Sequence, residues 1–289
     1  MGTLKKVTVF GATGKVGKEL LKFLSGAGIH TIAVTRDKNK AKEMPFVEWM
    51  EADMSARESL NKTIENSSAV FLASSPSDNF VRDQNNVIET AKKCDVAHIV
   101  KISSPGASKN SPAAVPKLHW EIEELLKASG IQWTILQPNS FMQNWLGEFS
   151  KTIQTERKIY DAAGDGKKPY IDTRNIAEVA FKALTEPEKH SNKIYLLTGG
   201  EALNYGQVAT AISKAIGEKV TYISLTPDEA KLRMEQKGMP QWAIQTFLAI
   251  AEGQRSGKAD YVNDIVQEIL NKPPLTIDDF ARDYAGYFK

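Results

Sequence analysis

A short apolar strand that runs directly into a glycine-spaced turn limits the folds open to this chain more than any other feature. Residues 7–10 are β-formers, and Gly11, Gly14 and Gly17 follow them at three-residue intervals. Gly11 permits a tight turn, Gly14 lets the backbone approach a pyrophosphate, and Gly17 lets a helix pack close to the strand. Because a helix N-terminus presents unpaired N–H groups, this junction predicts a cradle for a dinucleotide phosphate.

The residues on either side of the turn support a strand, turn and helix. Leu20, Leu21, Phe23 and Leu24 recur at helical spacing, and residues 31–35 form a second strand-like run, which completes a βαβ unit. A glycine turn without a ligand is the alternative interpretation. Under the first interpretation, the turn residues that bind the cofactor are Gly11, Thr13, Gly14, Lys15, Val16 and Gly17.

Composition excludes several classes of function. The 289 residues are 42% hydrophobic and 25% charged, which is typical of a globular protein of one or two domains. The net charge of +2 is too small to indicate the strongly basic surface of a nucleic-acid-binding protein. Cys94 is the only cysteine, and the histidines lack ligand spacing, so we expect no disulfide framework and no metal site. The four histidines are His30, His98, His119 and His190.

The chain has no apolar run long enough to span a bilayer, and its first residues lead into a core strand rather than a signal peptide. We therefore expect no membrane association and a cytoplasmic location.

Strand-like and helical runs alternate through the first half of the chain. This alternation predicts an α/β fold, a Rossmann-type doubly wound parallel sheet covered on both faces. The expected strands are 7–10, 31–35, 46–50, 69–73, 98–102 and 132–136, and the expected helices are 15–26, 56–65, 80–93 and 115–129.

The regular alternation of strands and helices ends after Pro138, and helical residues follow to about Lys151. We assign residues 1–150 to a cofactor-binding Rossmann domain, to which later elements return, and residues 151–289 to a smaller, mainly helical C-terminal lobe that covers the substrate. The expected strands of this part are 158–161 and 193–197, and the expected helices are 175–184, 205–216, 227–236, 240–252 and 277–287.

In such a sheet, ligands bind outside the carboxyl ends of the strands, so the residues that follow each strand are the candidates. Arg36 ends the second strand, about 20 residues beyond the last turn glycine, where an arginine accommodates the 2′-phosphate of NADP. NADP(H) is therefore the preferred cofactor. Asp37 follows directly and keeps NAD(H) open, because a carboxylate there binds a free ribose hydroxyl.

The other strand ends offer contacts to the rest of a dinucleotide. After the third strand, the Asp53 carboxylate can accept a hydrogen bond from adenine while Met54 packs on the ring, although Asp53 also suits a helix cap. Small residues after the fourth and fifth strands let a ring or ribose come close, and they are equally typical of plain turns. These residues are Ala73, Ser74, Ser75 and Ser103.

At residues 119–123, 133–145 and 170–177, together with the glycine turn, Arg36 and Asp53, the chain resembles a known family. It is similar to the NmrA-like, atypical branch of the short-chain dehydrogenases/reductases, close to the NADPH-dependent quinone oxidoreductases and triphenylmethane reductases. The resemblance covers nearly the whole chain. It implies that Pro138 and Phe141 line the nicotinamide pocket and that Asn139 supplies a polar contact there.

The chain departs from the wider superfamily at its catalytic pair. Typical members use Tyr-x-x-x-Lys, whereas the alignment implied by the resemblance places Val115 at the tyrosine and His119 at the lysine. A hydride transfer to a quinone or a similar planar conjugated acceptor needs no phenol. His119 then orients the acceptor or donates a proton, since its intrinsic pKa lies near neutrality. The alternative is a histidine on a polar helix face with no chemistry.

Two functions follow from these residues. The first is an NADPH-dependent reductase of a quinone or similar planar or aromatic acceptor. The second is a non-catalytic NADP(H) sensor that acts through a protein partner. The aromatic side chains Phe141, Trp145, Tyr170 and Trp242 are expected either to form a substrate wall or to belong to the core.

Overall fold

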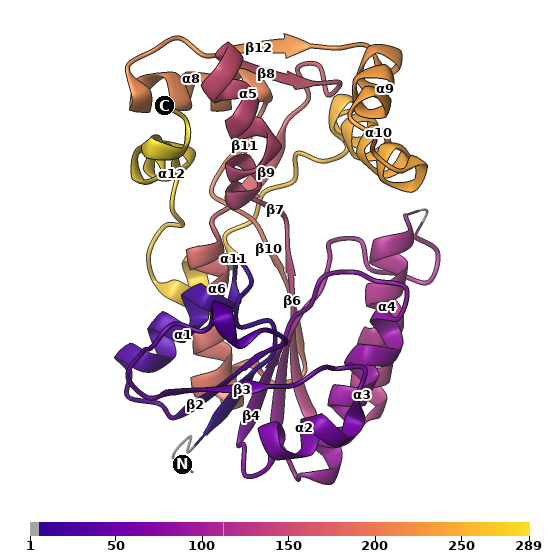
Figure 1. The fold of residues 1–289 in the computed structure, drawn as a ribbon, viewed down its shortest axis with the longest axis vertical. Helices are drawn as coiled ribbons and strands as arrows, with labels where there is room; N and C mark the ends of the chain where they lie inside the picture. Colours follow the sequence, from indigo (N-terminus) through magenta and orange to yellow (C-terminus); the bar gives the residue numbers. More distant parts are fainter. Residues whose placement is uncertain (1–5, 112) are drawn as a thin grey trace. The chain divides into compact units, whose positions relative to one another are not determined.

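A seven-stranded, fully parallel sheet carries the first part of the fold (Figure 1). The computed structural model describes residues 6–111 and 113–289. The strands lie in the order β10-β6-β5-β4-β1-β2-β3, which confirms the predicted fold class. Their bounds are β1 (Val7–Val9), β2 (Thr31–Thr35), β3 (Val47–Glu51), β4 (Ala69–Leu72), β5 (His98–Ile102), β6 (Gln132–Pro138) and β10 (Lys193–Leu197).

The chain divides into two compact units. The first comprises Met1–Pro138, Thr173–Leu197 and Ile269–Asn271, and it contains the whole parallel sheet. The second comprises Asn139–Asp172, Thr198–Glu268 and Lys272–Lys289.

Helices cover both faces of the sheet in the first unit (Figure 1). Helices α1 (Gly17–Gly26) and α6 (Thr173–Thr185) lie on one face, and α2 (Arg57–Ile64), α3 (Phe80–Lys93) and α4 (Ala114–Ala128) lie on the other. The central strands are buried along their whole length, which explains their continuous apolar sequence. The short helix α7 (Pro187–His190) precedes β10.

Two predicted boundaries are corrected for identifiable reasons. The first helix begins at Gly17 instead of residue 15, because Gly14 N–H donates to the Gly11 carbonyl (2.9 Å) and keeps the preceding residues in a turn. The third strand begins at Val47 instead of residue 46, because Phe46 adopts a left-handed conformation with φ of 62°.

The second unit combines two small sheets with a majority of helical residues. Strands β11, β9 and β7 form one sheet, and β12 pairs with β8 in the other. The strands are β7 (Ser140–Phe141), β8 (Lys158–Asp161), β9 (Lys168–Ile171), β11 (Ala202–Leu203) and β12 (Thr221–Ser224). The helices are α5 (Glu148–Glu156), α8 (Tyr205–Ile216), α9 (Pro227–Gln236), α10 (Gln241–Arg255) and α12 (Ile277–Asp283), with α11 (Ile265–Leu270) shared between the units.

Aromatic rings form the centre of the second unit. The Trp145 ring lies 4.6 Å from Phe149 and 5.2 Å from Tyr205, measured between ring centroids, and 5.8 Å from Tyr170. Trp145 and Tyr170 are therefore core residues, as the second of the two interpretations predicts. Trp242 on α10 is 71% exposed and does not belong to this core.

A buried lysine in the second unit is covered by the same aromatic side chains and is influenced by a half-buried acidic group. The Lys168 ammonium lies 5.2 Å from the Tyr170 ring centroid and 5.7 Å from that of Tyr205. Burial lowers the pKa of Lys168 and raises the pKa of Asp161, while the opposite charges of the two groups counteract both shifts. Such a pair fits a structural role in the core.

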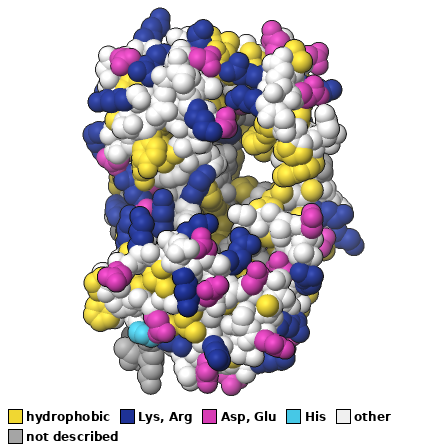
Figure 2. Space-filling model, viewed as in Figure 1, with side chains coloured by type: hydrophobic (Ala, Val, Ile, Leu, Met, Phe, Trp, Pro, Cys, Tyr) yellow, Lys and Arg dark blue, Asp and Glu magenta, His cyan; other side chains and the backbone are white. Residues whose placement is uncertain are grey.

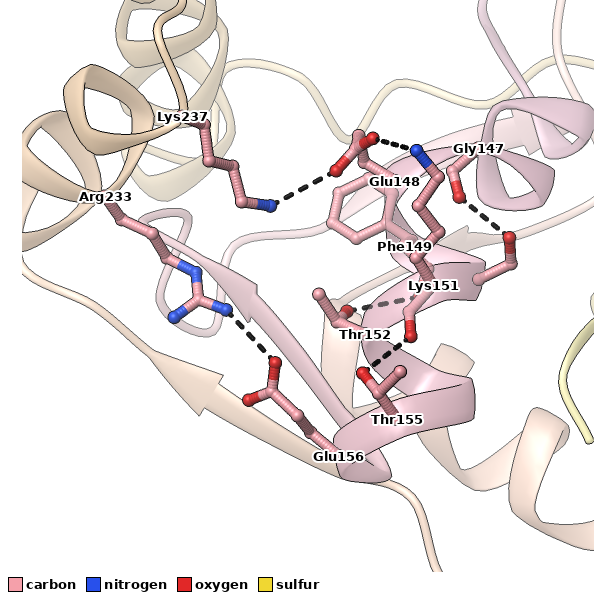
Figure 3. Close-up of polar contacts among 10 residues, drawn as sticks. Gly147, Glu148, Phe149, Lys151, Thr152, Thr155, Glu156, Arg233 and Lys237 are labelled. Atoms are coloured by element: carbon pink, nitrogen blue, oxygen red, sulfur yellow. Dashed lines mark hydrogen bonds and ion pairs between the residues drawn. The ribbon is translucent and has the colours of Figure 1, made fainter.

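Ion pairs attach α9 to α5 at the surface of the second unit (Figure 3). Lys237 contacts Glu148 at 3.2 Å, and Arg233 contacts Glu156 at 3.6 Å while stacking 3.8 Å from the centroid of Tyr160. Exposed pairs of this kind contribute only about 0–1 kcal/mol each. Figure 2 shows basic and acidic side chains interspersed over the visible surface, in keeping with a net charge of +2.

A buried histidine of the first unit has its tautomer determined by its neighbours. His98 Nε2 lies 2.9 Å from Thr134 Oγ1, and the Thr134 hydroxyl donates its only proton to the His190 carbonyl (2.9 Å). Thr134 must therefore accept from His98, which places the imidazole proton on Nε2. Burial lowers the pKa of His98 to about 4.

We predict that the free energy of unfolding falls as pH is lowered from 7 to 5. The unfolded chain protonates His98 and His119 near pH 6.5, whereas burial lowers their folded pKa values to about 4 and about 3. The stabilisation is thus complete above pH 6.5 and is lost toward pH 4, by about 1–2 kcal/mol per histidine at pH 5. Urea titrations at each pH measure it.

The matched controls are His98→Gln, which should reduce the decline, and His30→Gln at an exposed position, which should leave it unchanged. An equal decline in His98→Gln and the wild type would contradict the assignment.

Candidate functional site

The carboxyl ends of the parallel strands bring most of the predicted cofactor residues of the first unit to one edge of the sheet. Gly11 follows β1 and Ala73 follows β4, and these two strands are neighbours at the centre of the sheet. The chain leaves β1 toward α1 on one face and leaves β4 toward α3 on the other (Figure 1). This is a topological switch point, where open α/β sheets bind their ligands.

The outer two turn glycines are required by backbone contacts. Gly11 has φ of +75°, and a Cβ there would lie 2.5 Å from the Ala73 carbonyl oxygen. A Cβ on Gly17 would lie 2.1 Å from the Gly11 carbonyl oxygen. Neither position can therefore accept a side chain without moving the backbone.

The middle of the turn is exposed and is available to a ligand. Thr13, Gly14 and Lys15 are exposed, while Val16 is buried and anchors the turn. A Cβ on Gly14 would contact only the Gly11 carbonyl oxygen, at 3.0 Å. Apart from this oxygen and the two neighbouring residues, no protein atom lies within 4 Å of the position that a Gly14 Cβ would occupy. This open space is what the close approach of a pyrophosphate requires. Partial burial and the neighbouring Lys18 lower the pKa of Lys15.

Arg36 and Asp37 have different surroundings at the end of β2. Arg36 is exposed, so its guanidinium can reach a phosphate. The Asp37 carboxylate accepts a hydrogen bond from Asn39 N–H (3.0 Å) and lies 3.8 Å from the Lys40 ammonium. Because Asp37 is already engaged in its own turn, the arrangement favours a 2′-phosphate over a free ribose hydroxyl.

The chain after β3 forms a turn that is closed by a side-chain hydrogen bond and lies beside a cavity. The Asp53 carboxylate accepts from Ser55 N–H (2.8 Å), and this bond lowers the pKa of Asp53. The Asp53 carboxylate therefore closes a local turn and does not cap α2, whose N-cap is Ala56 without a side-chain capping bond. The expectation that Asp53 caps the helix is thus wrong, and its adenine contact stays a prediction. Met54 is half-buried, and its carbonyl accepts from the buried Asn86 amide (2.9 Å). The cavity has a volume of about 610 Å³ and is lined by Ser55, Ala56, Arg57, Glu58, Arg82 and Asn86.

Asn86 is a further candidate for the site, because it lines this cavity, and sequence analysis did not identify it. Besides holding the Met54 carbonyl, its side-chain oxygen accepts from Arg57 Nε (2.7 Å). An asparagine in the middle of a long amphipathic helix carries no signal of this role in the sequence.

The serines after β4 and β5 differ in their accessibility. Ser75 is exposed, and the exposed Ser74 accepts a hydrogen bond from the buried Gln84 (3.0 Å). Ser103 is buried and donates to the Glu123 carboxylate (2.5 Å). Pro138 ends β6 and is also buried. Contacts of these residues with a cofactor stay predictions.

Two predicted nicotinamide residues belong to the second unit. The Asn139 side-chain oxygen accepts from Ser140 N–H (2.8 Å), and Phe141 on β7 aligns with Ile171 on β9. Their roles toward the nicotinamide stay predictions.

His119 lies in a buried polar cluster that spans β5, α4 and β6. The Lys101 ammonium lies 3.0 Å from His119 Nδ1. One turn further along α4, the Glu123 carboxylate accepts from Ser103 and from the Gln137 amide (2.9 Å). Burial, and secondly the charge of Lys101, lower the pKa of His119 to about 3. The environment therefore overrides the near-neutral intrinsic pKa, and His119 is a neutral imidazole at physiological pH.

Val115 occupies the first turn of α4, one turn before His119, and is half-buried. In residues 6–111 and 113–289, no three ligating His, Cys, Asp or Glu side chains come together as a metal site requires. No helix in the described part of the chain is long and apolar enough to cross a bilayer.

Comparisons with known proteins identify the family of the chain by its sequence and support its fold by its structure. The sequence profile of the NmrA-like family matches residues 3–278. An NAD(P)H azoreductase from Xenophilus azovorans is 32% identical over 287 residues, which cover 98% of this chain and 99% of the azoreductase. In structure, an NADPH-dependent quinone oxidoreductase from Escherichia coli, complexed with NADPH, superimposes with a TM-score of 0.85 at 24% identity, covering 96% of this chain and 99% of that one. A triphenylmethane reductase from Citrobacter sp. reaches 0.84 at 23% identity, with the same coverage.

We predict that one glycine substitution in the turn mainly lowers stability and that another mainly weakens cofactor binding. Gly17→Ala should lower the free energy of unfolding by at least about 2 kcal/mol, because its Cβ would meet backbone atoms that cannot move aside. Gly14→Ala should cost less than about 1 kcal/mol of stability yet weaken dinucleotide binding at least about tenfold. Urea unfolding and calorimetric titration separate the two effects. Unchanged binding in a folded Gly14→Ala protein would place the phosphate site elsewhere.

Proposed function

The chain belongs to the NmrA-like family, and from this premise we propose that it is an NADPH-dependent oxidoreductase which transfers hydride to a quinone or similar planar conjugated acceptor. The family membership confirms the resemblance carried by the sequence motifs. The observation that carries the proposal is the exposed Gly14 turn at the switch point, with Arg36 at the adjacent strand end. These residues fit a pyrophosphate and a 2′-phosphate, respectively.

The relatives support the choice of acceptor. They are named for the reduction of azo compounds, quinones and triphenylmethanes, all of which are conjugated molecules. The proposal therefore names a small planar or aromatic acceptor, with neither nucleic acid nor membrane as a partner. It includes a cytoplasmic location, where an NADPH pool is available. The same proposal assigns cofactor binding to the domain at residues 1–150 and acceptor binding to the lobe at residues 151–289.

The residues of the chain have limited but definite tasks in this reaction. The cofactor supplies the hydride, and the protein supplies binding, orientation and exclusion of water. Val115 has no proton to give. His119 is neutral, so it serves as a hydrogen-bonding group that orients the acceptor, and protons reach the product from solvent. Gly11, Thr13, Gly14, Lys15, Val16, Gly17, Arg36, Asp53, Met54, Ala73, Ser74, Ser75, Ser103, Pro138, Asn139 and Phe141 are the proposed cofactor residues.

The test is steady-state oxidation of NADPH with a panel of small quinones, azo dyes and triphenylmethane dyes. Turnover with at least one acceptor is expected. Tight NADPH binding without turnover on any acceptor would contradict the proposal and leave the sensor acting through a protein partner. A His119→Ala variant should lower turnover or raise KM while NADPH affinity stays unchanged.

We predict that Arg36→Ala weakens NADPH binding by about 10- to 100-fold, because one charge-assisted hydrogen-bonding partner of the 2′-phosphate contributes about 1–3 kcal/mol. NADH binding should be nearly unchanged. Lys38→Ala, a loss of positive charge in the same exposed segment, is the matched control. Calorimetry that finds equal NADPH and NADH affinities in the wild type would rule out this assignment.

A further inference from the structure

We propose that Lys101 is a positioning residue: its ammonium donates a hydrogen bond to His119 Nδ1, holds the imidazole in the Nε2–H tautomer, and so makes His119 a neutral hydrogen-bond donor for the acceptor. The catalytic consequence rests on the reductase function proposed above. The tautomer itself does not.

The position of Lys101 is unusual for a lysine. It is the fourth residue of β5 and is 0% exposed, although lysine is almost never fully buried unless it is paired. Its ammonium lies 2.9 Å from the Ile102 carbonyl and 3.0 Å from His119 Nδ1. These two contacts supply acceptors for a charge that would otherwise be costly to bury.

The chemistry of the two groups determines which atom donates. A protonated lysine has three N–H donors and no lone pair, so it cannot accept from an imidazole. His119 Nδ1 must then be the unprotonated nitrogen, and the single proton of the neutral ring lies on Nε2. The His119 and Phe80 rings pack in a T-shaped arrangement, with the centroids 5.0 Å apart and the planes at 83°, and this contact restricts rotation of the imidazole.

The ionisation of the pair agrees with this assignment. Burial lowers the pKa of Lys101 to about 7, and the negative charge of Glu123 opposes that shift. His119, with a pKa of about 3, loses its proton far more readily than Lys101 does, so below about pH 7 the pair carries its charge on the lysine. A neutral histidine that donates from a fixed nitrogen is a known way to polarise a carbonyl group.

Glu123 holds the other side of the cluster in place. Its carboxylate accepts from Ser103 at the end of β5 and from Gln137 on β6, and it is 2% exposed. Lys127, four residues along α4, lies 3.8 Å from the same carboxylate. The cluster therefore joins α4 to two strands, and Lys101 is its contact with His119.

The test compares two variants by NMR of protein labelled with ¹⁵N-histidine at pH 6, which lies below the pKa of about 7 of Lys101 and above the pKa of about 3 of His119. Lys101→Met keeps the length of the side chain and removes the donor, whereas Lys101→Gln keeps a donor and removes the charge. In the wild type and in Lys101→Gln, the imidazole correlations of His119 should show the proton on Nε2 and a hydrogen-bonded Nδ1. In Lys101→Met, the Nδ1 resonance should shift and the Nδ1–H tautomer should appear. His98 is the internal control, because Thr134 determines its tautomer.

A second readout connects the tautomer to catalysis. With an acceptor that the wild type reduces, Lys101→Met should lower kcat about tenfold with NADPH affinity unchanged, and Lys101→Gln should restore it to within about threefold. A packing role alone would not distinguish the two variants in this way. Equal kcat values for the wild type and Lys101→Met would overturn the catalytic half of the inference.

The spectrum of the wild type decides the tautomer even where a variant fails to fold. A proton on Nδ1 of His119 in the wild type, or an unaltered His119 pattern in folded Lys101→Met, would overturn the inference. Absence of any acceptor turnover in the wild type would instead contradict the reductase function, and the NMR result would still establish or refute the role of Lys101.

Discussion

The Gly11 carbonyl oxygen lies where a side chain on Gly17 would have to be, only 2.1 Å from an ideal Cβ, and the proposed cofactor site depends on this backbone contact. It places the start of α1 directly above the end of β1, so that the helix N-terminus and the exposed Gly14 face the same region. On the other side of Gly11, the Ala73 carbonyl leaves equally little room, which fixes the ends of β1 and β4 against each other. The switch point is thus built from backbone atoms and tolerates little substitution.

Much of the parallel sheet could be predicted, because fully buried strands appear as continuous apolar runs between glycine and proline turns. The short strands of the second unit could not. Strands β7 and β11 have two residues each, and they exist only through pairing with β9, a tertiary contact that leaves no periodicity in the sequence. Strand β3 begins one residue later than predicted, because Phe46 adopts a left-handed backbone conformation. A bulky residue rarely adopts this conformation, so sequence preference does not predict it.

The same distinction applies to the candidate site: residues at predicted strand ends could be predicted, and buried residues with distant partners could not. Arg36 and Asp53 follow predicted strands, and parallel topology brings all strand ends to one edge, so their placement was predictable. Asn86 and Lys101 were not, because their importance comes from burial and from partners distant in the sequence. His119 shows most clearly what the sequence alone could not predict. Its intrinsic pKa suggested a proton donor, whereas the folded chain lowers that pKa to about 3 by burying the ring beside a cation.

Under the proposed function, the buried cluster also explains how a site without a phenol retains a directed polar group. Burying an unpaired lysine or glutamate would carry a large free-energy penalty, because the charge loses its hydration. Here Lys101 donates to His119 and to the Ile102 carbonyl. The Glu123 carboxylate accepts from the Ser103 and Gln137 side chains. Because hydrogen bonds are stronger in a dry interior than in water, the same burial that costs stability holds the imidazole in one orientation. A hydride transfer that takes its proton from solvent requires orientation from the protein more than acidity, and a neutral, fixed imidazole provides orientation.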